Sequence, residues 1–182
     1  MFFSKSYPQK TAIVSLLLIL LVFSCTAPKS KLAQYGPDLE GVMLSDIGAF
    51  RGFNFGDSLG LIKVKEIGKP IEIDKDYLYY EYKLNKSGSF NITYNFDERG
   101  LNEIHSDIFI NNADDGDAVF NNFKAYFNQH YGDNQTQMGF IVWSVKSEKY
   151  GEIKINLSDE SADFTTDKAP AKISIWIYPD KS

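Results

Sequence analysis

His105 and Asp107, two positions apart, are the residues of this sequence best suited to proton transfer. A histidine held by a carboxylate can act as a general base, and a hydroxyl from Ser89 or Thr93 would supply a nucleophile. No catalytic motif such as G-x-S-x-G or H-E-x-x-H accompanies them, and a solvated strand face is the simpler interpretation. The other histidine, His130, is expected in the last turn of a helix and is assigned no chemistry.

The segment Asn111–Asp117, NNADDGD, is rich in the oxygen ligands that calcium prefers. Aligned on its glycine with an EF-hand loop, the segment places Asn111, Ala113 and Asn122 where Asp, Asp or Asn, and Glu are needed. These three departures favour a linker with a helix N-cap at Asp117 over a metal site. We therefore expect no metal and no cofactor.

Cys25 is the only cysteine, and it follows a short apolar run, Ala12–Phe23. The run is shorter than the roughly 20 residues that a membrane-spanning helix needs. Lys5 and Lys10 before it and the small Ser24 after it are typical of a secretory signal peptide. A single cysteine also excludes intramolecular disulfides and multi-cysteine metal sites.

The residues VFSC, ending at Cys25, resemble the lipobox of bacterial lipoproteins. This resemblance implies that residues 1–24 are removed and that the Cys25 thiol carries a diacylglycerol. The alternative is a plain membrane anchor with a chance cysteine. Acyl chains contribute about 0.8 kcal/mol per buried methylene and anchor a protein without a transmembrane helix. The lipobox resemblance implies a location in the cell envelope. The residues after Cys25, TAPKSK, lack the early acidic cluster that resembles surface-export signals in some lipoprotein-rich bacteria, so we expect the outer membrane, facing the periplasm.

The composition bounds the possible partners. The formal net charge is −5, and it becomes −7 without the two lysines of the signal peptide. An acidic chain without a basic cluster argues against nucleic acid as a partner. It also argues against electrostatic binding to anionic lipid over a broad surface. We interpret residues 25–48, with few periodic apolar positions, as the lipidated cysteine and a flexible tether, and residues 49–182 as one domain.

One pattern occurs twice in this domain: a helix and then three strands. The first helix follows Asp57 or Ser58, its N-cap candidates, and ends at Gly68. The second ends at Gly132. Alternation of apolar and polar residues predicts strands at 77–84, 89–96, 101–110, 138–145, 152–157 and 171–179. The core face of the first three strands is predicted to comprise Leu78, Tyr80, Tyr82, Leu84, Phe90, Ile92, Tyr94, Phe96, Ile104, Ile108 and Ile110.

The predicted fold class is α+β: two tandem αβββ units, about 49–112 and 113–179, with an antiparallel sheet and helices packed on one face. This arrangement resembles the β-lactamase-inhibitor-protein-like family. The segment FGDSLGLIKVKEIGKP, followed by an aromatic strand, is similar to the start of small lipoproteins of the outer-membrane assembly machinery (the SmpA/BamE type). The resemblance implies a protein that acts by binding other proteins.

The opposite face of the predicted sheet carries aromatic side chains that offer contact area at low entropic cost. A binding face and an ordinary sheet face are about equally consistent with them. Its candidate residues are Tyr77, Tyr79, His105, Phe109, Trp176 and Tyr178.

We therefore expect a lipid-anchored, non-catalytic module that binds another envelope protein as an assembly factor, adaptor or inhibitor. The alternatives are a small-ligand binder or hydrolase that uses His105 and Asp107, and a passive spacer lipoprotein.

Overall fold

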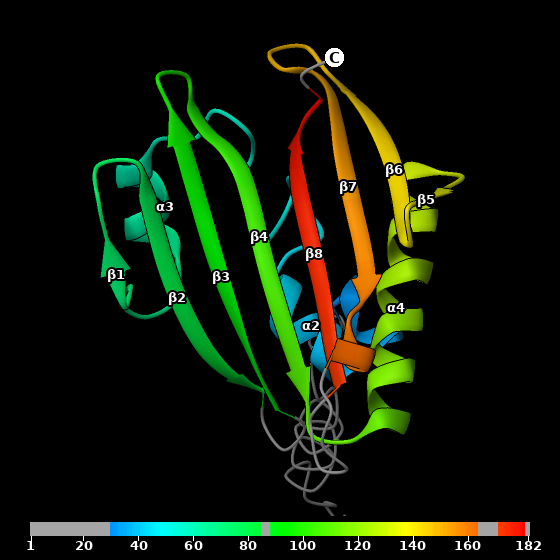
Figure 1. Cartoon of the computed structure of the whole chain (residues 1–182). Helices are drawn as coiled ribbons and strands as arrows, with labels where there is room; N and C mark the ends of the chain where they lie inside the picture. Colours follow the sequence, from blue (N-terminus) through cyan, green and yellow to red (C-terminus); the bar gives the residue numbers. More distant parts are fainter. Residues whose placement is uncertain (1–29, 85–87, 164–170, 181–182) are drawn as a thin grey trace, which may run out of the picture.

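The structure is a computed structural model that describes residues 30–84, 88–163 and 171–180. The predicted signal peptide, residues 1–24, and the lipidation site, Cys25, lie outside the described residues. Within these described ranges, three α-helices and one antiparallel sheet of eight strands make an α+β fold (Figure 1). The strands follow the order β1-β2-β3-β4-β8-β7-β6-β5 across the sheet. Their bounds are β1 Glu72–Ile73, β2 Tyr77–Leu84, β3 Gly88–Asp97, β4 Gly100–Ile110, β5 Gln135–Gln137, β6 Phe140–Ser147, β7 Gly151–Asp159 and β8 Ala171–Pro179.

The six long strands lie where the alternating pattern predicted them. Strands β2 and β8 have the predicted bounds, and β3, β4 and β7 differ by one or two residues at their ends. The predicted core face of β2, β3 and β4 is also confirmed, because its residues are buried or packed against buried ones. Successive side chains of a strand point to opposite faces, so the residues between them form the other face of the sheet.

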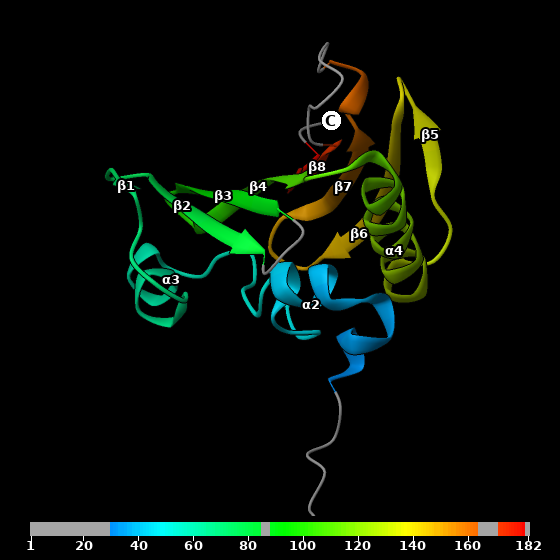
Figure 2. The same ribbon diagram turned by 90° about the horizontal axis from the view of Figure 1, so that it is seen from below.

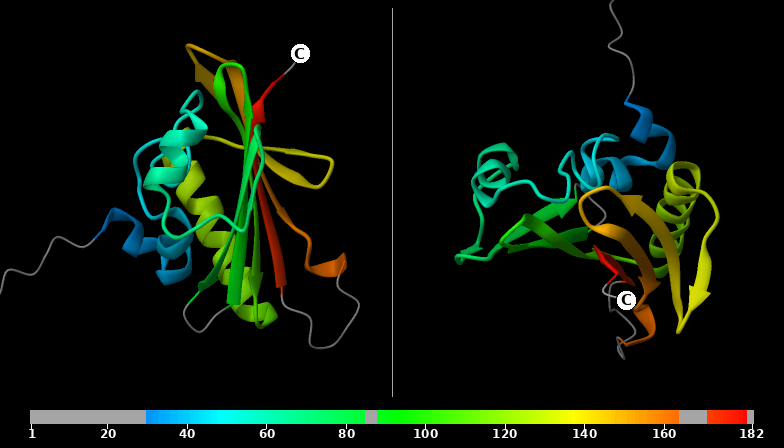
Figure 3. Two further views of the ribbon diagram at one scale, coloured as in Figure 1. Left: turned by 90° about the vertical axis from the view of Figure 1, so that its left-hand side faces the viewer. Right: turned by 90° about the horizontal axis from the view of Figure 1, so that it is seen from above.

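The helices α2 (Pro37–Met43), α3 (Leu59–Lys65) and α4 (Ala113–Tyr131) all lie on one face of the sheet (Figures 2 and 3). Ser58 caps α3 as expected, since its side chain accepts a hydrogen bond from the Leu61 amide. Gly132 ends α4 with a φ of 82°, also as expected. The N-cap of α4 is Asn112 and not Asp117, so this helix begins five residues earlier than predicted. Asn112 accepts from the Asp115 amide at 2.8 Å, and this bond satisfies one of the free amides of the first turn.

Residues 31–43 belong to the folded domain, which corrects the flexible tether predicted over residues 25–48. They form η2 (Lys31–Tyr35) and α2, with Pro37 at the first position of α2. Leu32, Leu39, Val42 and Met43 are buried in the core. These apolar residues are too few and too irregularly spaced to produce a clear helical period, and only packing against the sheet and α4 reveals their role.

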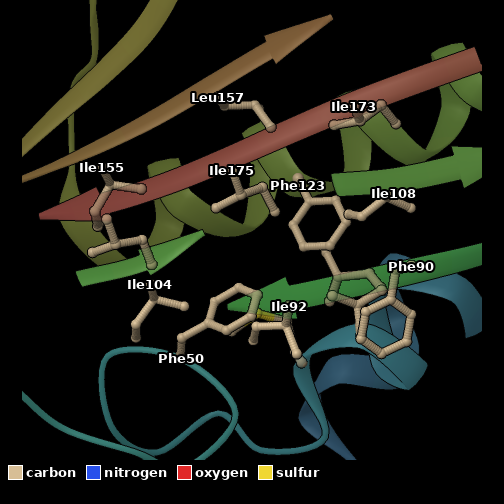
Figure 4. Packing of buried hydrophobic residues seen from close by; sticks show 14 of the residues in the cluster. Phe50, Phe90, Ile92, Ile104, Ile108, Phe123, Ile155, Leu157, Ile173 and Ile175 are labelled. Carbon is tan, nitrogen blue, oxygen red and sulfur yellow. The ribbon is translucent and has the colours of Figure 1, made fainter. Parts of the chain in front are cut away.

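The core lies between the sheet and the helices. Figure 4 shows Phe123 pointing from α4 toward isoleucines of β4 and β8, among them Ile108 and Ile175. Each fully buried side chain of this size contributes about 1.5–3 kcal/mol relative to its exposed state. A short helix, η3 (Ser161–Asp163), lies between β7 and β8 in the sequence.

One ion pair is buried within this layer. Arg51 donates from Nη2 to Glu66 Oε1 at 2.7 Å and from Nε to Glu66 Oε2 at 3.0 Å, and both side chains are 1% exposed. Tyr94 donates to Glu66 at 2.6 Å, and Arg51 also donates to the carbonyl of Val42. The pair therefore joins α2, the end of α3 and β3 through hydrogen bonds that satisfy both charges.

Candidate functional site

The open face of the sheet, opposite the helices, carries all six residues of the predicted binding face, but it does not bring all six together. Strands β4 and β8 pair at the centre of the sheet, so His105 lies directly opposite Trp176. Tyr77 and Tyr79 lie on β2, which β3 and β4 separate from β8. Phe109 lies toward the other end of β4, opposite Lys172. The structure thus groups three of the six predicted residues: His105, Trp176 and Tyr178.

These three residues form a line of rings. The His105 and Trp176 ring centroids are 5.5 Å apart, and those of Trp176 and Tyr178 are 5.6 Å apart in an edge-on arrangement. Trp176 remains 43% exposed. Tyr178 accepts a hydrogen bond from Asn156 Nδ2 at 3.1 Å, which fixes its hydroxyl on the neighbouring strand β7. A large exposed indole on a central strand is a rigid contact surface.

Trp176 and Tyr178 form part of the floor of an open groove of about 1330 Å³. The β5–β6 hairpin, which projects from the sheet on the side opposite the helices (Figure 3), contributes one wall. The turn between β3 and β4 contributes further lining residues. The groove is lined by Asp97, Arg99, Asn102, Glu103, Gln137, Met138, Phe140, Val142, Tyr150, Lys154, Asn156, Trp176, Tyr178, Pro179 and Asp180.

The hairpin wall has a tight turn at its tip. Gln137 pairs with Phe140, so Met138 and Gly139 are the two turn residues, and both have positive φ, 50° and 88°. Two-residue turns of this kind match the twist of antiparallel strands and usually contain Asn or Gly. Met138 occupies a conformation that few side chains adopt, and it is 99% exposed. The predicted strand start at Met138 is corrected to Phe140.

The turn at the other side of the groove is held by charged contacts. Arg99 donates to Asp97 at 2.8 Å and lies over the Tyr150 ring, with Cζ 4.4 Å from the ring centroid. Lys149 donates to the Arg99 carbonyl at 2.7 Å. The hydrogen bond from Arg99 holds the pKa of the Asp97 carboxyl below its ordinary value. These contacts link the β3–β4 turn to the β6–β7 turn.

A polar cluster adjoins the groove at His105. His105 Nε2 lies 3.1 Å from Ser174 Oγ and 3.3 Å from Asp107 Oδ1. Lys172 Nζ lies 3.4 Å from the other carboxylate oxygen of Asp107. Burial alone would raise the pKa of Asp107, but its contact with the His105 ring and the charge of Lys172 outweigh burial and lower this pKa. The carboxylate therefore stays ionised in the folded protein.

This cluster does not have the geometry of a Ser-His-Asp triad. In a triad the carboxylate binds one ring nitrogen of the histidine and the serine hydroxyl binds the other. Here Asp107 and Ser174 both contact Nε2. Of the hydroxyls suggested by the sequence, Thr93 lies opposite His105 on β3, whereas Ser89 lies opposite Phe109. Ser174, which the sequence analysis did not consider, is the hydroxyl at hydrogen-bonding distance.

The acidic segment Asn111–Asp117 forms the cap and the first turn of α4. Asn112 caps the first turn, and Asp114 and Asp115 lie at its positive end, where carboxylates are favourable. Across the residues that the structure describes, no group of three or more His, Cys, Asp or Glu side chains is arranged to hold a metal ion. His130 lies in the last turn of α4, with Nδ1 3.0 Å from the Tyr126 carbonyl.

Sequence reasoning missed the groove itself. Three of its apolar residues, Met138, Phe140 and Val142, lie on the hairpin, and Tyr150 lies in a turn. Gly139 was the available signal for a turn, but the polar segment before it gave no strand pattern. The direction in which the hairpin projects depends on the twist of the whole sheet.

No protein-family model, no curated protein and no solved structure matches this chain. Within the described ranges, no helix is both long enough and apolar enough to cross a membrane.

Proposed function

We propose that this chain is an envelope lipoprotein, attached through acylated Cys25, whose domain binds another envelope protein in the open-face groove without catalysing a reaction. One observation carries the proposal: the composition of the groove lining. Trp, Tyr, Phe, Met and Arg are the residues enriched where proteins bind one another. The groove presents Arg99, Met138, Phe140, Tyr150, Trp176 and Tyr178.

The way these residues are held supports the same proposal. Trp176 and Tyr178 stand on a central strand that pairs on both sides, and aromatic side chains lose little conformational freedom on binding. Arg99 is fixed by Asp97 and by the Tyr150 ring. Binding energy would therefore not be spent on ordering the main contact residues.

The groove also offers hydrogen-bond acceptors. The side-chain oxygens of Asn102 and Asn156 are buried among the lining residues and have no partner within the described protein. A partner that rearranges the lining slightly would satisfy them with backbone amides or hydroxyls. These acceptors would add specificity to the contact area of the rings.

The proposal includes the finer arrangement of the fold as two αβββ units, α3–β2–β3–β4 and α4–β6–β7–β8. The two units have the same order of elements along the chain. Across the sheet their strands lie in mirrored order, β2-β3-β4 and then β8-β7-β6, which supports this relationship. It agrees with the resemblance to the β-lactamase-inhibitor-protein-like and SmpA/BamE-type groups, which implies an assembly factor, adaptor or inhibitor at the periplasmic side of the outer membrane. Fold alone does not determine function, so the groove carries the argument.

A small-ligand binder or hydrolase at His105 is the second candidate, favoured by the contacts among His105, Ser174 and Asp107. The use of one ring nitrogen for both contacts argues against a catalytic triad. A His105→Ala variant separates the two proposals. An enzyme would lose its activity, whereas a binding face would lose only the part of its affinity that comes from the ring next to Trp176.

Affinity capture from the detergent-solubilised native envelope tests the proposal. The mature chain is compared with a groove variant, Met138→Ala/Trp176→Ala, and with a matched control on the same sheet face outside the groove, Tyr77→Ala/Tyr79→Ala. Truncating an interface hot spot costs about 2 kcal/mol or more, which is roughly a 30-fold loss of affinity. We expect one partner to be retained by the native and control chains and lost by the groove variant.

Equal retention by all three chains, or loss with the control variant alone, would show that the groove is not the binding site. Thermal unfolding of each variant checks that the fold is unchanged.

A further inference from the structure

Exposed apolar side chains gather on two opposite sides of this molecule. Met138 and Trp176 belong to the groove. The other large exposed apolar residues of the described chain lie after α2, on α3 or near β1, on the side of the sheet that carries the helices (Figures 2 and 3). They are Leu44, Ile47, Val64, Ile67, Ile71 and Ile73. The groove does not account for this second set.

Four of these residues form the α3–β1 patch, at the sheet edge: Val64, Ile67, Ile71 and Ile73. Ile73 pairs with Leu78, a core residue, so its side chain lies on the helix side of the sheet. Ile62 faces the core from α3, whereas Val64 is 83% exposed. The other three residues of the patch are half or more exposed. Four exposed aliphatic side chains within residues 64–73 are more than the scattered single ones that are normal on a protein surface, and they indicate an interaction surface.

Exposed lysines outnumber exposed acidic residues around this patch. Lys63, Lys65 and Lys69 are exposed between Leu59 and Ile71. The one acidic residue in that stretch, Glu66, is buried and neutralised by Arg51. The turn after Ile73 adds exposed Asp74, Lys75 and Asp76, whereas Glu72 pairs with Tyr79 and lies on the open face. Lysines therefore remain in excess around the patch, although the chain as a whole is acidic. The net charge of the whole sequence does not show this local excess of lysines.

The composition of the patch identifies its partner. Protein interfaces are enriched in aromatic residues, Met and Arg and are depleted of Lys. The patch is aliphatic, and lysines outnumber acidic residues around it, which is the composition of surfaces that insert into the boundary of an anionic bilayer. We infer that the α3–β1 patch rests on an anionic lipid surface, with its aliphatic side chains at the acyl boundary and Lys63, Lys65 and Lys69 at the headgroups.

The position of the lipid anchor agrees with this inference, which here rests on the proposed acylation of Cys25. The described chain begins at Ser30, on the helix side of the sheet (Figure 3). Five residues span at most about 18 Å, so acylated Cys25 would hold the helix side close to the membrane. The open-face groove would then point away from the bilayer.

The test uses the full mature chain in vesicles, with an environment-sensitive dye on one introduced cysteine. Val64→Cys places the dye in the patch. Lys83→Cys is the matched control, because Lys83 is exposed on β2 at the same sheet edge but points to the open face. The vesicles contain phosphatidylcholine with or without phosphatidylglycerol, and flotation reports attachment. We expect a blue shift and increased emission at position 64 with anionic vesicles only, and no change at position 83.

Charge reversal by Lys63→Glu/Lys65→Glu/Lys69→Glu is expected to abolish the shift at position 64. Each lysine near an anionic surface contributes about a fivefold gain in partitioning, so the loss should exceed a hundredfold. An unshifted dye at position 64 on chains that float overturns the inference and leaves the anchor intact. A blue shift that appears without vesicles, and only at high protein concentration, would assign the patch to contact with a second copy of the chain. That result would also overturn the inference. Labelling of Cys25 itself, seen as two dyes per chain, shows that the anchor proposal has failed, independently of the shift.

Discussion

At the scale of single residues, Arg51 and Glu66 form an ion pair that is almost completely buried. Both side chains are excluded from water, and Tyr94 completes the hydrogen bonds of the carboxylate. The Arg51 guanidinium also lies 4.9 Å from the Tyr82 ring centroid. A buried pair contributes little net stability compared with apolar residues, but removing one partner leaves the other charge buried and unpaired.

Glu66→Gln is therefore expected to destabilise the fold by about 3–5 kcal/mol, because Arg51 would keep its charge without a counterion. Glu98→Gln, an exposed carboxylate in the β3–β4 turn, is the matched control and should change stability by less than about 0.5 kcal/mol. Urea unfolding followed by tryptophan fluorescence measures both. Equal stability of the two variants would mean that water reaches Arg51.

The same pair makes stability depend on pH. Burial raises the pKa of Glu66, but the hydrogen bond and charge of Arg51 outweigh burial, and the pKa lies below its ordinary value of 4.5. A carboxyl with a lowered pKa stabilises the fold above its unfolded pKa, and this contribution disappears as the pH falls through the lowered value. We expect the stability difference between the native chain and Glu66→Gln to be constant near neutral pH and to shrink below pH 4.5. A difference that grows with acid would contradict this assignment.

At the scale of elements, the six long strands and the α3 cap could be predicted because local signals decide them. Alternating side chains in β2 and β8 fixed both strands to the residue. The start of α4 could not be predicted in the same way, because Asn112 and Asp117 are equally good caps by residue type. The structure selects Asn112, and the earlier start places Gly116 inside the helix, against β8.

Elements that depend on tertiary contacts could not be predicted from the sequence. Helix α2 has seven residues and is stable only because it packs on the sheet and α4. The three-residue strand β5 is fully exposed and has no apolar alternation. Of the site, His105, Trp176 and Tyr178 were predicted, but the hairpin wall at Met138 depends on the twist of the completed sheet.

The close approach of α4 to β8 gives a prediction at this scale. A methyl group at Gly116 would lie 2.3 Å from Ala171 Cβ, so Gly116→Ala should separate the helix from the sheet and destabilise the fold by about 1–3 kcal/mol. Gly60→Ala in α3 is the matched control, since a methyl group there meets nothing closer than 4.0 Å. That change should be neutral or stabilise by up to about 1 kcal/mol. Thermal unfolding of both variants separates the effect of crowding against Ala171 from the effect of helix propensity. A Gly116→Ala variant more stable than the native chain would contradict the close contact of α4 with β8.

At the scale of the whole molecule, the N-terminal helices join the two halves of the sheet. Helix α2 contacts both β2, in the first half, and α4, in the second. The Tyr35 hydroxyl donates to Gln129 of α4, and its ring packs edge-on against Tyr126. The segment just after the proposed lipid anchor is thus a structural part of the domain.

Leu39→Ala is expected to destabilise the entire domain by about 2–5 kcal/mol, because the side chain is buried between these elements. Leu44→Ala, at an exposed position just after α2, should cost less than about 0.5 kcal/mol. Fluorescence and far-ultraviolet circular dichroism should report one coincident transition for both variants. A wild-type stability for Leu39→Ala would restore the interpretation of this segment as a tether.

The pairing of β4 with β8 at the centre of the sheet has a kinetic consequence. These strands lie more than sixty positions apart along the chain, so their pairing requires the closure of a long loop, which is intrinsically slow. In the finished protein the sheet ends in strands of two and three residues, β1 and β5, which leave little edge for other chains to join. Until the central pair forms, strands of eleven and nine residues have open edges instead. The risk of aggregation therefore belongs to the unfinished chain, during the interval in which a chaperone would have to protect it.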